Sequence, residues 1–156
     1  MVRFLKIVSL VLVAFVAAGL IAYRFVCPCS IIPGGELSGA VELESVSDWS
    51  FANEVPLCQL EVNPQRPHSI NLNCMSDQGR LFVSCSQCAS KRWAATALEI
   101  PEGRIRIQDT VYPVSMRRLE SDADLDLSWR ARSIKLGKEP DVPRPDHWWS
   151  FEMHSR

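Results

Sequence analysis

Hydrophobic and polar residues alternate with a period of two in six segments of the chain, which is the pattern of strands with one buried face. In one of them, Ile105 and Ile107 alternate with Arg104 and Arg106. Turn residues such as Asp77-Gln78-Gly79 separate the segments. The predicted strands cover residues 41–46, 57–62, 68–75, 80–85, 104–108 and 111–118.

Two further segments have the spacing of helices. One covers residues 90–100 and ends before Pro101. The other covers residues 122–136, begins with acidic residues, ends with basic residues and precedes Gly137, which suits the helix dipole and a C-terminal stop. The sequence therefore predicts a mainly β (α+β) domain. The predicted domain is a six-stranded antiparallel barrel with one or two short helices. Closure of the barrel would remove exposed sheet edges.

The N-terminal segment is apolar from residue 7 to residue 23 and follows Arg3 and Lys6. We predict an uncleaved membrane helix that contacts the bilayer through residues 7–26. Cleavage of a signal peptide near Ala17-Ala18-Gly19 is the alternative. The positive-inside rule places the N-terminus in the cytoplasm and the soluble part on the extracytoplasmic, periplasmic side, and the reverse topology remains open.

Composition supports a single folded domain behind this helix. The chain has 156 residues, of which 47% are hydrophobic and 22% are charged, as in globular proteins. The formal net charge of −1 argues against nucleic acid as a partner bound through a general cationic surface. We divide the chain into a membrane anchor (1–26), a tether rich in turn residues (27–39) and a barrel domain (40–156).

The most informative stretch for chemistry runs from the fourth predicted strand into the first predicted helix. It contains Ser84 and Ser86, and the helix begins near Lys91 and Arg92. Residues 26–90 hold two basic residues, whereas residues 91–118 hold six. Hydroxyls, cations and free helix amides favour a phosphate group. The alternative is that Lys91 and Arg92 form only a solvated first turn.

Six cysteines support other hypotheses. Cys85 and Cys88 form a Cys-x-x-Cys motif at a helix start, where a thiol pKa is lowered, so they are candidates for a redox pair or a plain disulfide. Together with Cys27 and Cys29 they could instead supply four sulfurs to zinc, although we expect no metal. Two others, Cys58 and Cys74, lie at positions of their strands that face inward, so they are expected to be core thiols or a mutual disulfide.

The order of these elements resembles the FMN-binding split-barrel family, which includes pyridoxamine 5'-phosphate oxidases, flavin reductases and deazaflavin-dependent nitroreductases. The resemblance covers roughly residues 38–136. Its matching features are Pro67-His68-Ser69, Gly79-Arg80-Leu81-Phe82-Val83, Lys91-Arg92-Trp93, Pro101-Glu102-Gly103-Arg104-Ile105-Arg106-Ile107 and Val111-Tyr112-Pro113-Val114.

The resemblance implies a split barrel that binds FMN or a deazaflavin, often as a homodimer. The resemblance implies that the cofactor is bound by residues between the fourth predicted strand and the first predicted helix, and by one residue at a strand start. These residues are Ser84, Ser86, Lys91, Arg92, Trp93 and His68. It does not account for Cys85 and Cys88, and most family members lack a membrane helix.

The sequence thus favours a membrane-anchored, flavin- or deazaflavin-binding oxidoreductase that acts by hydride transfer on a small substrate. Two alternatives remain open. One is a non-catalytic split-barrel binding module, and the other is an extracytoplasmic thiol–disulfide protein that uses Cys85 and Cys88. The aromatic tail, with Trp148, Trp149 and Phe151, is expected to pack on the domain.

Overall fold

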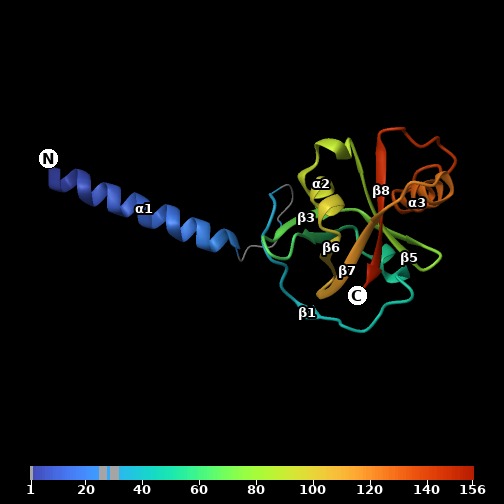
Figure 1. The fold of residues 1–156 in the computed structure, drawn as a ribbon, viewed down its shortest axis with the longest axis horizontal. Coiled ribbons are helices and arrows are strands. Elements are labelled where there is room, and N and C mark those ends of the chain that lie inside the picture. Colours follow the sequence, from blue (N-terminus) through green and yellow to red (C-terminus); the bar gives the residue numbers. More distant parts are fainter. Residues whose placement is uncertain (1, 25–27, 29–31) are drawn as a thin grey trace.

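A computed structural model describes residues 2–24, 28 and 32–156 (Figure 1). The strands of the domain form one sheet. They are β1 (Ala40–Val41), β2 (Cys58–Val62), β3 (His68–Leu72), β4 (Cys74–Asp77), β5 (Arg80–Ser86), β6 (Glu102–Ile107), β7 (Thr110–Arg118) and β8 (Trp148–Ser155). The helices are α1 (Val2–Arg24), η1 (Ser50–Glu54), η2 (Cys88–Ser90), α2 (Arg92–Glu99) and α3 (Asp122–Lys135).

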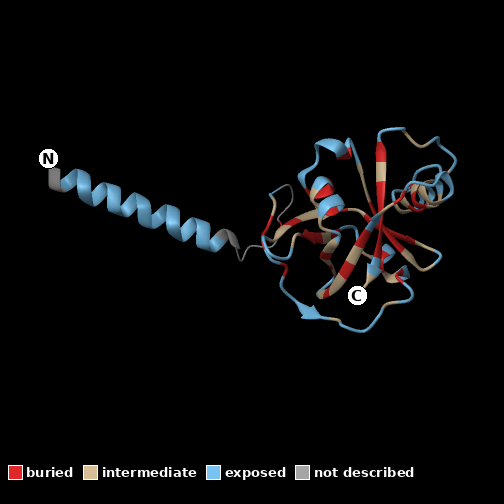
Figure 2. Ribbon diagram, viewed as in Figure 1, coloured by how far each residue is buried: buried red, intermediate tan, exposed pale blue. Residues whose placement is uncertain are grey.

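Helix α1 projects away from the domain, and its side chains from Phe4 to Ala22 are exposed (Figure 2). This apolar stretch of 19 residues is about 28 Å long as a helix, close to the roughly 30 Å thickness of a bilayer's hydrocarbon core. By length and composition α1 is therefore a candidate membrane span.

The sheet has the order β3-β2-β6-β7-β8-β5-β4, and every neighbouring pair on this path is antiparallel. Among the described strands, only β1 pairs in parallel, with β7. Strands β3 and β4 lie at opposite ends of the path, yet a single residue, Asn73, connects them. The sheet therefore curls into a half-barrel. The disulfide between Cys58 of β2 and Cys74 of β4 links the second strand of the path to the last one. The predicted α+β barrel class is confirmed.

The main hydrophobic core fills the inside of the curled sheet. It receives the residues that the alternating pattern turned inward, among them Leu60, Ile105 and Val114, each 0% exposed. A second, smaller cluster lies on the outer face under α3, where Phe82 and Trp148 are buried. Strand β5 is thus buried on both faces, which explains its continuous apolar run Leu81-Phe82-Val83.

The strand count differs from the prediction, because the sheet has eight strands rather than six. The tail forms β8, a central strand between β7 and β5. The sequence did not predict this strand, because two of its buried positions are polar and break the apolar alternation. The Ser150 hydroxyl lies 2.6 Å from that of Ser128, and the Glu152 carboxylate accepts from Arg80 at 2.6 Å. The tail aromatics do pack on the domain, with Trp148 and Phe151 buried.

Two predicted strands also have different limits. The predicted strand 68–75 breaks at Asn73, where the chain passes from one end of the sheet to the other. The predicted strand 41–46 is reduced to Ala40–Val41, and the residues after it are mostly exposed. The two helices agree with the prediction to within two residues, and the Ser121 hydroxyl caps α3 by accepting from the amide of Asp124 at 3.2 Å.

Residues 34–37 lie against the domain. Gly34 forms a two-way backbone bridge with Ser69 of β3, and the amide of Leu37 donates to the carboxylate of Glu61 at 2.6 Å. Glu61 is fully buried and also accepts two hydrogen bonds from Arg104, at 2.9 and 2.7 Å. Residues 34–37 are therefore fixed to β2 and β3, beginning ten residues after α1 ends at Arg24.

Candidate functional site

A cavity of about 370 Å³ lies between β3, the end of β5 and the start of α2. We call it the α2 pocket. It is lined by residues from four separate parts of the chain: Ile32, Pro33, Ile70, Asn71, Leu72, Ser84, Cys85, Lys91 and Trp93. Apolar side chains form most of it, and Lys91 and Ser84 supply a cation and a hydroxyl.

The structure brings together some of the residues predicted to bind a cofactor. Ser84, Lys91 and Trp93 all line the α2 pocket, together with the redox candidate Cys85. Ser86 and Arg92 are exposed and lie next to lining residues without lining the pocket themselves.

Trp93 also has a structural role. It is only 6% exposed, and its ring packs against that of Phe151 at a centroid distance of 5.4 Å. The tryptophan therefore belongs to the barrel core and presents one part of its ring to the pocket. Replacing it would disturb the fold as well as any ligand.

The start of α2 has the charge distribution of an anion site. Lys91 is the N-cap residue, and the first turn holds no acidic residue. Among the described residues, no side chain caps the helix. The cations of Lys91 and Arg92 oppose the helix dipole, which favours negative charge at an N-terminus. An anion bound beside these cations would remove that unfavourable interaction.

His68 adds a third basic group at this end of the domain. It lies on the same side of β3 as the lining residues Ile70 and Leu72, because side chains alternate along a strand. Burial lowers the pKa of His68 below its usual value, and the positive charge of Arg92 lowers it further. His68 and Arg92 are therefore close enough to interact, although they come from different elements.

The second disulfide, Cys85–Cys88, joins the end of β5 to η2, just before α2. The two candidate cysteines are thus bonded to each other. A thioredoxin-like motif would follow a strand of a parallel βαβ unit. Here β5 is antiparallel to both of its neighbours, β4 and β8. These antiparallel neighbours argue against a thioredoxin-like catalytic motif and favour a disulfide that forms part of the pocket wall.

Metal binding finds no support within the described ranges. No group of three or more His, Cys, Asp or Glu side chains in residues 2–24, 28 and 32–156 could hold a metal ion. The hypothetical zinc site includes Cys27 and Cys29, which lie outside the described residues.

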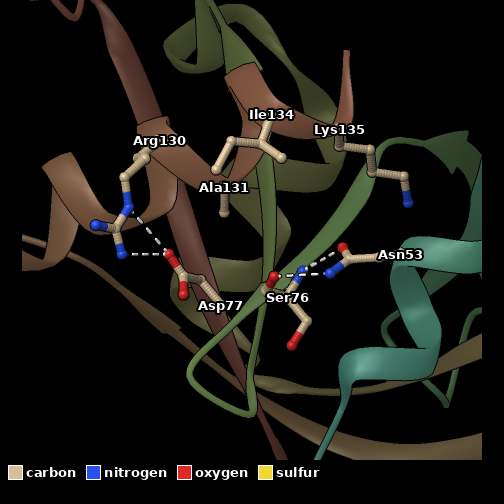
Figure 3. A pocket seen from close by; sticks show the side chains of 7 residues that line it. All are labelled: Asn53, Ser76, Asp77, Arg130, Ala131, Ile134 and Lys135. Atoms are coloured by element: carbon tan, nitrogen blue, oxygen red, sulfur yellow. Dashed lines mark hydrogen bonds and ion pairs between the residues drawn. The ribbon is translucent and has the colours of Figure 1, made fainter. Parts of the chain in front are cut away.

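The sequence analysis missed a larger cavity of about 530 Å³ between α3, β4 and η1 (Figure 3). Its polar groups mostly bind one another. The Asn53 side chain donates to Ser76 O at 2.9 Å and accepts from Ser76 N at 2.8 Å, and Arg130 contacts Asp77 at 2.6 Å. Lys135 donates to the carbonyls of Ala52 and Cys74.

These contacts cover the free edge of β4, which would otherwise offer unpaired backbone groups to another chain. Burial lowers the pKa of Lys135 to about 8. No local pattern marked Lys135, because a lysine in the last turn of a helix is usually a solvated residue. We assign this cavity to the closure of the sheet.

Comparisons with known proteins support the fold. No family model matches the chain, and no curated protein matches it in sequence. A putative pyridoxamine 5'-phosphate oxidase from Listeria innocua has a similar structure, with a TM-score of 0.54 and 10% identity, over 68% of this chain and 88% of that one. A conserved hypothetical protein from Mycobacterium tuberculosis gives a TM-score of 0.53 and 15% identity, over 68% and 76%.

The heme storage protein HutZ from Vibrio cholerae is also similar, with a TM-score of 0.52 and 18% identity, over 68% of this chain and 85% of that one. At such identities the likeness shows the fold alone. The chain has the split-barrel fold of the pyridoxamine 5'-phosphate oxidase-like proteins, and the resemblance inferred from the sequence is confirmed at this level.

Proposed function

We propose that this protein is a membrane-anchored oxidoreductase that binds a flavin-type cofactor, FMN or a deazaflavin, in the α2 pocket. The observation that carries the proposal is the meeting of Ser84, Lys91 and Trp93 in one cavity. The sequence pattern predicts a cofactor-binding role for these same three residues. The split-barrel fold, shared with a putative pyridoxamine 5'-phosphate oxidase, adds a second line of support.

The residues of the pocket fit such a group. A flavin nucleotide combines an anionic phosphate with a flat, largely apolar ring system. Lys91, the Ser84 hydroxyl and the free amides of α2 are donors suited to the phosphate. The side chains of Ile70, Leu72 and Trp93 offer an apolar surface to the ring.

The cofactor would supply two-electron hydride transfer, and the protein would orient the ring and exclude water. Lys91 and Ser84 would hold the phosphate end, while the buried side chains of Leu72 and Trp93 would limit ring movement. Pro33 belongs to the segment fixed to β3, so the chain that leads from α1 would close one side of the site.

Ligand titration of the full chain in detergent micelles tests the proposal. We expect FMN or a deazaflavin to bind with a dissociation constant in the micromolar range or below, roughly 8 kcal/mol, with quenching of flavin fluorescence. Hemin is the comparison ligand, because one structural neighbour is a heme storage protein. Absence of binding by both flavin types to a folded chain would refute the proposed function. Binding without turnover of any electron acceptor would favour the non-catalytic module.

We further propose that α1 (Val2–Arg24) spans a membrane and that the barrel lies on the extracytoplasmic side. Two disulfides support this, because disulfides persist in oxidising compartments and are rare in the cytoplasm. A membrane-impermeant amine reagent applied to intact cells is expected to label the exposed Lys138 and to leave Lys6, before the apolar run, unlabelled. Labelling of Lys6 alone would establish the opposite topology. The homodimer implied by the family resemblance stays a prediction.

A further inference from the structure

The Cys85–Cys88 disulfide is part of the α2 pocket. Cys85 lines the cavity beside Ser84, and the bond connects β5 to η2 across only three positions of sequence. Lys91 follows η2 directly. The covalent bond therefore joins β5, which supplies Ser84 and Cys85 to the pocket, to the short helix that leads directly into Lys91.

The two disulfides differ in accessibility. Cys58 and Cys74 are 1% and 0% exposed within the barrel core. Cys85 is half-buried at the edge of a cavity, whereas its partner Cys88 is fully buried. Thiol–disulfide exchange requires a thiolate to reach one sulfur of the bond, so exposed disulfides are the labile ones. Of the four cysteines in the described disulfides, Cys85 is the one that is not buried, so an approach is open from its side.

The loop closed by this bond holds an unfavourable backbone conformation. Gln87 has φ 53° and ψ 41°, a left-handed conformation that costs a non-glycine residue about 1–2 kcal/mol. The Gln87 carbonyl accepts from the amide and the hydroxyl of Ser90 at 3.1 and 2.9 Å, and Cys88 O accepts from the amide of Lys91 at 2.9 Å. The position of Lys91 thus depends on the conformation that the disulfide closes.

We propose that Cys85–Cys88 is a thiol–disulfide exchange site that regulates the α2 pocket: the bonded form holds Lys91 in the binding geometry, and the dithiol form releases it. The proposal rests on the proposed function for the identity of the ligand and for the compartment of the exchange partner. The exchange partner is an extracytoplasmic dithiol, either a small molecule or the reduced Cys-x-x-Cys pair of a protein.

A thiolate of the partner attacks the Cys85 sulfur, the Cys85–Cys88 bond breaks, and Cys88 leaves as a thiolate that takes up a proton. The second thiolate of the partner attacks the mixed disulfide and releases Cys85, which is also protonated. The protein gains two electrons and two protons, and the partner dithiol becomes a disulfide. Lys91 lines the pocket together with Cys85, so its cation favours the Cys85 thiolate that the second step releases.

Reduction and ligand binding are then reciprocally linked. A ligand in the pocket covers the Cys85 sulfur and stabilises the bonded form. If reduction weakens FMN binding tenfold, saturating FMN must make the disulfide harder to reduce by the same factor, about 30 mV for a two-electron couple.

Hydrogen exchange on the full chain in detergent decides the proposal. Dithiothreitol is titrated until alkylation and mass analysis show Cys85 and Cys88 reduced and Cys58 and Cys74 still bonded. We expect faster amide exchange in residues 84–93 and at least tenfold weaker FMN binding, with unchanged exchange in β2 (Cys58–Val62) and β6 (Glu102–Ile107). The double variant Cys85→Ala/Cys88→Ala should match the reduced chain and respond no further to dithiothreitol.

Unchanged exchange in residues 84–93 after reduction would overturn the proposal, as would equal FMN affinity in both states. Faster exchange with no FMN binding in either state would support the exchange site and refute the flavin function. The two proposals therefore fail in different ways.

Discussion

Replacing both Lys91 and Arg92 by alanine is expected to weaken FMN binding on the order of 100-fold. Each charge-assisted hydrogen bond to a phosphate contributes about 1.5–3 kcal/mol, and every 1.4 kcal/mol changes the dissociation constant tenfold. Lys91 lines the α2 pocket, and Arg92 lies beside it at the first turn of α2 (Arg92–Glu99). Fluorescence titration at low salt measures the effect, and the salt dependence of binding should weaken in the variant.

A matched control removes the same charge elsewhere. Lys138 and Arg156 are exposed, and Arg156 follows the end of β8 that lies farthest from Ser86. The variant Lys138→Ala/Arg156→Ala should bind FMN within about twofold of the parent chain, since surface charges beyond a Debye length of roughly 8 Å are screened. Equal losses in the two double variants would mean that general charge, and not the pocket, attracts the ligand.

Nuclear magnetic resonance of the imidazole tests the placement of Arg92 independently. Burial and then Arg92 hold the pKa of His68 below 6.5. The single change Arg92→Ala removes a positive neighbour, which favours the protonated imidazole, so the His68 pKa should rise toward its usual value. A pKa that does not move would show that Arg92 lies away from His68 in solution.

Removing the Cys58–Cys74 disulfide is expected to lower the free energy of unfolding by about 3 kcal/mol. The bond closes a loop with a sequence separation of 16, and a loop of this length removes about that much conformational entropy from the unfolded chain. The bond also joins β4, at one end of the curled sheet, to β2, the strand next to the other end. The variant Cys58→Ala/Cys74→Ala should therefore melt roughly 10 °C lower in thermal denaturation.

The other disulfide provides the comparison. Cys85 and Cys88 are only three positions apart, so the same entropy argument gives a smaller loss, about 2 kcal/mol, for Cys85→Ala/Cys88→Ala. Hydrogen exchange should separate the variants further, with faster exchange in β4 (Cys74–Asp77) only when Cys58 and Cys74 are replaced. If both variants melt at the temperature of the parent chain, the disulfides do not stabilise the domain.

The sequence by itself determined the strands that have one buried and one exposed face, and the helices whose ends carry charges that suit the helix dipole. The alternation in β6 and β7 identified their inward side chains, since a strand with one solvent-exposed face alternates polar and apolar residues. The acidic start and basic end of α3 identified that helix, because the helix dipole acts over a single turn. The basic helix start at Lys91 marked a candidate anion site for the same reason.

The tertiary structure decided the features that depend on contacts between residues far apart in the sequence. Strand β8 carries the buried polar residues Ser150 and Glu152, whose partners come from α3 and β5, so its pattern resembles no ordinary strand. The break at Asn73 exists only because the sheet must close on itself.

The candidate pocket shows the same division. Local sequence selected Ser84 and Lys91, but Ile70 of β3 and Pro33 beyond α1 joined them only when the chain folded. Their contacts connect residues far apart in the sequence, and the free energy that fixes them comes from burial of the whole barrel. Residue types and periodicity therefore determined which groups are available, and the closure of the sheet decided which of them meet.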